Sequence, residues 1–207
     1  MKKILSLFLA IMMMVAAFSG CSDEKTEENN SKLEIEGEDE GGITVSGGEP
    51  LLQKDIIAFI KKIKDMGFSV KLDTNGAYPK KLKDLVNKGL IDYVAMDIKT
   101  CKERYPDVIG IPSANIGSIM ESVEFLKQGT VPYEFRTTVV KELHSAEDFA
   151  RIGEWISGCP NYFLQNYVDS ENVLVSGFSS CSKEELLSFR DIVKSYVGHV
   201  ELRGVDY

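Results

Sequence analysis

The sequence predicts an α/β protein with a parallel sheet, preceded by two segments of a different character. From Gly42 onward, short strand-like apolar runs alternate with stretches of helical periodicity, as expected of successive β/α units. Before Gly42 the chain has an apolar N-terminal run and then an acidic, polar stretch. The 207 residues, 43% of them hydrophobic, can bury one good core. We therefore expect one domain with N-terminal appendages.

The predicted strands are apolar runs that are bounded by Gly, Pro or Asn. In order, they are residues 42–48, 68–76, 91–99, 132–140, 161–168 and 199–205. Between them, apolar residues three and four apart predict helices at 51–67, 79–89, 113–129, 145–158 and 182–198. Pro79 begins the second helix, and Ser182 with Glu185 predicts a capping box on the last. These units are too few for an eightfold barrel and suit an open partial barrel or a doubly wound sheet.

Residues 1–21 have the pattern of a targeting signal. Lys2 and Lys3 precede an uncharged apolar run over residues 4–19, and Cys21 follows directly. Small residues before the cysteine resemble a bacterial lipoprotein signal, in which the cysteine is lipidated, although Phe18 stands where Leu is more usual. This predicts a membrane-anchored, extracytoplasmic protein. An ordinary secretory signal or an uncleaved anchor is the alternative.

Residues 22–41 are predicted to be a flexible acidic tether. Residues 21–40 carry nine acids and two bases, and almost no aromatic residues. A segment of this composition buries too little apolar surface to offset the conformational entropy that it would lose on ordering. The remaining domain, residues 42–207, is near neutral and has no basic footprint, which argues against nucleic-acid binding.

The other cysteines, Cys101, Cys159 and Cys181, are widely spaced and odd in number. They form no CxxC pair and predict no disulfide framework, so we expect buried or idle thiols. Two histidines alone cannot build a metal site.

Polar residues gather where the predicted strands end, which is where parallel α/β folds bind ligands. Gly47-Gly48 ends the first strand before Glu49 and Pro50, and Asp73-Thr74 ends the second. A tight turn opening a helix is the alternative for the glycines, and a left-handed turn for Asn75-Gly76.

The third and fourth strands add charged residues to the same edge. Asp97 and Lys99 share one face of their strand, as do Glu134 and Arg136 with Thr138. Asp97 and Lys99 must point into a polar cavity or at each other, and the face of Glu134 and Arg136 implies a polar lumen or a cross-strand ion pair. His144 follows the fourth strand, where a plain loop role is the alternative. Together the groups suit a small zwitterionic or nucleoside-like ligand.

The stretches "VSGGEP", "LDTNG", "MDIK", "YEFRTTVVKELH" and "VELRGV" make residues 42–207 similar to the radical S-adenosylmethionine activating enzymes. The likeness is to anaerobic ribonucleoside-triphosphate reductase activating proteins and then to pyruvate formate-lyase activating enzymes. It implies a partial (β/α)6 barrel, a glycyl radical enzyme as partner, and S-adenosylmethionine with a 4Fe-4S cluster as cofactors. Together with the polar positions at the strand ends described above, the likeness gives a set of candidate cofactor-binding residues. They are Gly47, Gly48, Glu49, Pro50, Asp73, Thr74, Asp97, Lys99, Arg136 and His144.

The chain departs from this family upstream of Gly47. The CxxxCxxC motif that supplies the cluster's thiolates is absent, and Cys21 is the only upstream cysteine. The first β/α unit is also missing, which predicts an unpaired apolar sheet edge at Gly42. Three hypotheses follow: an inactive, shortened or fused activase; a membrane-anchored lipoprotein with a cluster-free small-molecule-binding α/β domain; or a fusion artefact near residue 41.

Overall fold

The computed structural model describes residues 33–38, 41–169 and 177–205. The predicted signal with Cys21, and residues 22–32 and 39–40 of the predicted tether, lie outside the described residues.

One sheet carries the described part of the chain, and its strands stand in the order in which they occur in the sequence. The strands are β1 (Leu33–Glu38), β2 (Gly42–Gly47), β3 (Ser69–Thr74), β4 (Tyr93–Asp97), β5 (Tyr133–Val139), β6 (Asn161–Asn166) and β7 (His199–Arg203). Each neighbouring pair from β2 to β7 is parallel, and β1 runs antiparallel to β2. The six parallel strands confirm the six strands predicted from the sequence.

Helices connect the parallel strands. They are η1 (Pro50–Leu52), α2 (Ile56–Asp65), α3 (Pro79–Asn87), η2 (Lys102–Arg104), α4 (Tyr105–Val108), α5 (Gly117–Lys127), α6 (Ala146–Trp155) and α7 (Lys183–Val193). The five predicted helices are confirmed as α2, α3, α5, α6 and α7, and the predicted capping box of Ser182 and Glu185 starts α7. The sequence did not predict η2 or α4.

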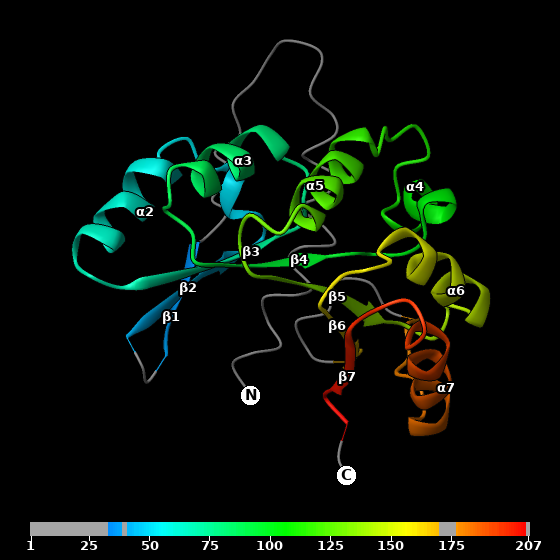
Figure 1. Ribbon diagram of the computed structural model, residues 1–207. Coiled ribbons are helices and arrows are strands. Elements are labelled where there is room, and N and C mark those ends of the chain that lie inside the picture. Colours follow the sequence, from blue (N-terminus) through cyan, green and yellow to red (C-terminus); the bar gives the residue numbers. More distant parts are fainter. Residues whose placement is uncertain (1–32, 39–40, 170–176, 206–207) are drawn as a thin grey trace.

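The strand order decides between the two sheet types left open by the sequence. A doubly wound sheet reverses its strand order at a switch point, whereas this order runs in one direction throughout. Right-handed crossovers that all advance the same way place their helices on one side of the sheet. Figure 1 shows the helices along the outer side of a curved sheet. The fold is therefore an open partial barrel.

Alternation along the strands gives the sheet one apolar and one polar face. The apolar face packs against the helices in a core that includes Leu72, Met96 and Phe135 on the strands and Ile60 and Leu82 on the helices, each 0% exposed. The opposite face carries charged side chains from the central strands. The fold thus directs ionisable groups toward the side of the sheet that the helices do not cover.

The prediction of an unpaired edge at Gly42 is wrong, and so is the prediction of a tether as far as residues 33–38 are concerned. Strand β1 pairs with β2 from Leu33 opposite Gly47 to Glu38 opposite Gly42. The acidic composition obscured a period-2 alternation of Leu33 and Ile35 with glutamates, which is a strand pattern. Gly41, with φ of +80°, precedes β2 in a conformation that suits glycine.

Candidate functional site

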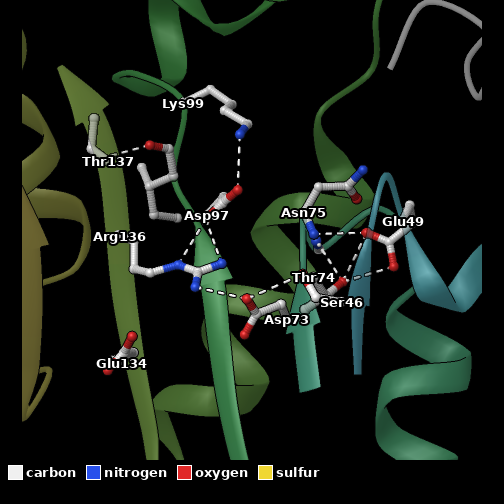
Figure 2. A network of polar contacts seen from close by, with 12 residues as sticks. Ser46, Glu49, Asp73, Thr74, Asn75, Asp97, Lys99, Glu134, Arg136 and Thr137 are labelled. Carbon is white, nitrogen blue, oxygen red and sulfur yellow. Dashed lines mark hydrogen bonds and ion pairs between the residues drawn. The ribbon is translucent and has the colours of Figure 1, made fainter. Parts of the chain in front are cut away.

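The predicted site residues come together at the carboxyl ends of β2 to β5. Gly47 ends β2, Asp73 and Thr74 end β3, and Asp97 ends β4. Lys99 lies two residues beyond β4, Arg136 lies within β5, and His144 follows β5. Figure 2 shows the charged side chains of this rim turned toward one another. Whether each of them binds a cofactor remains a prediction.

Glu49 is buried, and its carboxylate binds groups of the protein itself. It accepts hydrogen bonds from the backbone N–H of Leu51 (2.9 Å) and Asn75 (2.7 Å), and from the Thr74 hydroxyl (3.0 and 3.1 Å). Burial raises the pKa of Glu49 to about 7, although these donors act to lower it. Glu49 therefore fastens the turn after β2 to the end of β3.

Arg136 is the centre of a buried ion-pair network across three strands (Figure 2). Its guanidinium donates to Asp73 at 2.9 Å and to Asp97 at 3.0 Å, and Lys99 donates to the other oxygen of Asp97 at 2.9 Å. The Ser46 hydroxyl extends the network to β2 through Asp73. Two carboxylates and two cations balance, so the network as a whole is neutral.

Electrostatic attraction fixes the charge states in this network. Burial acts to raise the pKa of Asp97, but the Lys99 and Arg136 cations outweigh burial and hold that pKa below its usual range. Burial likewise acts to lower the pKa of Arg136, and the carboxylates of Asp97 and Asp73 raise it instead. Both sequence alternatives hold here, since the charges pair with one another and also line the polar face of the sheet, opposite the face that packs against the helices.

Three buried polar atoms at this rim have no hydrogen-bond partner among the described residues. They are Asp73 Oδ1, Thr100 Oγ1 and Thr138 Oγ1. Buried polar atoms in folded proteins almost always have a partner. Asp73 therefore offers an acceptor, and the threonines offer hydroxyls, to a polar ligand or to water.

His144 is buried, and both of its ring nitrogens contact the backbone. Nδ1 accepts from the Val140 N–H at 3.0 Å, so Nε2 carries the proton and donates to the Lys99 carbonyl at 2.8 Å. Burial lowers the pKa of His144, which agrees with a neutral ring. A cavity of about 20 Å³, enough for one water, lies beside His144, Lys99 and Thr138.

Two supporting residues were missed by sequence reasoning. The Tyr105 hydroxyl accepts from the Lys99 N–H at 3.2 Å, and Lys81 donates to the carbonyls of Leu51 (2.7 Å) and Gln53 (2.9 Å). Tyr105 lies in a stretch without periodicity, so nothing in the sequence marked it. Lys81 had a usable signal, because a cation in the first turn of a helix is unusual.

The described residues do not fit an iron–sulfur cluster. Cys101, Cys159 and Cys181 are free and buried, as expected from the sequence. Burial raises the pKa of the Cys159 thiol to about 12 and of the Cys181 thiol to about 11, which disfavours the thiolates that a cluster needs. Across the described ranges, no group of three or more His, Cys, Asp or Glu side chains could hold a metal ion. None of the described helices is both long and apolar enough to cross a membrane.

Comparisons with known proteins identify the family of the chain. The profile of the Radical SAM superfamily matches residues 20–156. A Methanocaldococcus jannaschii protein, provisionally named a glycyl-radical enzyme activating enzyme, is 32% identical over 172 residues, which are 79% of this chain and 71% of that protein. The pyruvate formate-lyase-activating enzyme of Listeria monocytogenes is 27% identical over 129 residues, or 58% of this chain and 51% of that enzyme.

Solved structures agree on the fold. A domain of a pyruvate-formate lyase-activating enzyme from Bacteroides vulgatus superposes with a TM-score of 0.64 at 20% identity, over 79% of this chain and 99% of that domain. The profile match over residues 20–156 shows that the chain belongs to the radical SAM superfamily. Within it, the relatives by sequence include glycyl-radical enzyme activating enzymes. The chain spans from about half to 71% of the length of these two relatives.

Proposed function

We propose that the domain from Gly42 binds S-adenosylmethionine at the carboxyl ends of β2 to β5, as part of an activating protein for a glycyl radical enzyme. A partner such as an anaerobic ribonucleoside-triphosphate reductase is the proposed class, since the motif likeness is to its activating proteins. The observation that supports ligand binding best is the convergence of Asp73, Arg136, Asp97 and Lys99 at one rim, at the same end of the sheet where Gly47 ends β2.

The chemistry of the rim suits the parts of this ligand. The backbone of Gly47-Gly48 would accept from the ligand's ammonium group, because glycine has no Cβ to prevent close approach. Lys99 would pair with its carboxylate, and Asp97 would accept from the ribose hydroxyls. The unpartnered oxygen of Asp73 is a further acceptor. Binding would require Lys99 to exchange part of its contact with Asp97 for the ligand.

The expected binding can be measured by titration calorimetry of the full-length chain with S-adenosylmethionine. We expect saturable binding that Asp97→Asn weakens by about tenfold, because the loss of one charged hydrogen-bond partner corresponds to about 1.5 kcal/mol. Glu121→Gln, on the outer surface of α5, is the matched control and should bind as the unchanged protein does. Absence of saturable binding by the unchanged protein would contradict the proposal.

We further propose that this chain does not cleave S-adenosylmethionine. The printed sequence has no CxxxCxxC motif, and the described thiols are dispersed and buried. Anaerobic reconstitution with iron and sulfide should leave no stoichiometric cluster on the protein. No 5′-deoxyadenosine should form when dithionite and S-adenosylmethionine are added. A bound cluster with 5′-deoxyadenosine formation would overturn this part of the proposal and leave the binding site intact.

The N-terminal segment carries a separate proposal, which is that Cys21 is lipidated and anchors the domain outside the cytoplasm. It rests on the apolar run and the small residues before Cys21. Mass spectrometry of the protein isolated from its own cells would test it. A lipid-modified Cys21 followed by "SDEKTEENN" would support the lipoprotein and exclude a fusion artefact. A longer chain with CxxxCxxC upstream of "GGITVSGGEP" would overturn it.

A further inference from the structure

The turn after β2 is tied at both of its ends to a single short segment of the chain. At the first end, Glu49 accepts from Thr74 and Asn75, at the end of β3. At the second end, the carbonyls of Leu51 and Gln53 accept from the Lys81 ammonium at 2.7 and 2.9 Å. Both anchors therefore lie within residues 74–81.

The position of Lys81 is unfavourable for its own helix. Helix α3 begins at Pro79, its first turn contains Lys80 and Lys81, and that turn holds no acidic residue. Cations at a helix N-terminus oppose the helix dipole. The ammonium instead lies 5.8 Å from the centre of the Tyr78 ring and reaches across to the turn. The contact with Leu51 and Gln53 accounts for a lysine at this place.

The glycine pair cannot fix its own backbone. Gly47 has φ of +138°, and glycine occupies many conformations at little cost. No side chain of Gly47 or Gly48 packs against the fold, so the flanking residues decide where the backbone acceptors lie. On the N-terminal side, Gly47 ends β2 opposite Leu33 of β1. On the C-terminal side, Glu49 holds the residue that follows the pair, and Lys81 holds the end of the η1 turn beyond it.

We propose that Lys81 is a positioning residue, which sets the backbone of Gly47-Gly48 for the ammonium group of the ligand by holding the carbonyls of Leu51 and Gln53. This inference rests on the proposed function for the identity of the ligand. The geometric part, that Lys81 orders the turn, stands on the contacts alone.

The binding test compares two ligands on the full-length chain. S-adenosylmethionine carries the ammonium group, whereas 5′-methylthioadenosine keeps the adenosine and sulfur without the amino acid arm. Lys81→Met should lower the affinity for S-adenosylmethionine about fivefold, as the loss of one hydrogen bond does. The affinity for 5′-methylthioadenosine should not change. Lys81→Arg should restore most of the affinity. Lys80→Met, an exposed neighbour with the same change of charge, should bind both ligands normally.

Hydrogen exchange of the backbone provides a readout that needs no ligand. Lys81→Met should speed exchange across residues 47–53, Lys81→Arg should reverse this, and Lys80→Met should have no effect. The positioning role would be overturned if Lys81→Met lowered the affinity for both ligands equally, or if it left hydrogen exchange over residues 47–53 unchanged. If the unchanged protein fails to bind S-adenosylmethionine while exchange responds as expected, the proposed function fails and the role of Lys81 in ordering the turn remains.

Discussion

Replacing Arg136 with methionine is expected to be the most destabilising single change at the rim. The Arg136 and Asp97 side chains are each 11% exposed, and Asp73 is 17% exposed. Asp97 would keep Lys99, but Asp73 would lose its ion pair with Arg136 and remain largely out of water. Removing one partner of a buried ion pair costs about 3–5 kcal/mol. We expect a loss of this size in the free energy of unfolding.

Urea unfolding at pH 7, followed by circular dichroism, would measure that loss. Arg151→Met is the control, because Arg151 also makes an ion pair, with Glu147 at 2.6 Å, but on the surface. It should leave stability close to that of the unchanged protein. Asp73→Asn added to Arg136→Met should recover part of the loss, because it removes the stranded charge. If Arg136→Met costs no more than Arg151→Met, the network does not hold the rim together.

Three further predictions concern single groups. Between pH 4.5 and about 7 the folded protein holds the Glu49 proton more tightly than the unfolded chain does, so the free energy of unfolding should fall as pH rises. Glu49→Gln should flatten this pH dependence, which urea titrations would measure. Gly76→Ala should cost at least about 1–2 kcal/mol in thermal unfolding, because Gly76 has φ of +79° and a Cβ would overlap the Met96 methyl; a neutral result would contradict the backbone geometry. In a Cys21→Ser variant, the thiols of Cys101, Cys159 and Cys181 should react with Ellman's reagent at pH 8 only after denaturation, and rapid labelling of that native variant would show that they are not buried.

The sequence predicted the elements whose residues carry a clear period or a clear stop signal. Helices such as α3, with Pro79 at its start, needed no tertiary information. The gathering of Asp73, Asp97 and Arg136 at one rim also followed from strand ends alone. Their pairing did not, because register and side-chain reach decide whether a charge faces a cavity or a neighbour, and only the fold sets Asp97 opposite Arg136.

The remaining misses have a common cause. Strand β1 is stabilised by pairing with β2, and the sequence of residues 33–38 alone does not show that this partner strand is present. Its acidic composition therefore led to the prediction of a tether. Tyr105 supports Lys99 from a connection without periodicity. Glu49 was predicted to belong to the site, yet its carboxylate is used inside the protein, which only its contacts with Thr74 and Asn75 could show.

The sequential strand order has a consequence for how such a chain can change over evolutionary time. Every strand in the described sheet pairs only with its neighbours in the sequence, so the architecture is additive, as in repeat proteins. Exchanging a terminal segment alters one interface and leaves the others in place. A recombination event near residue 41 could therefore replace everything upstream of β2 while the polar rim, built from β2 to β5, kept its geometry.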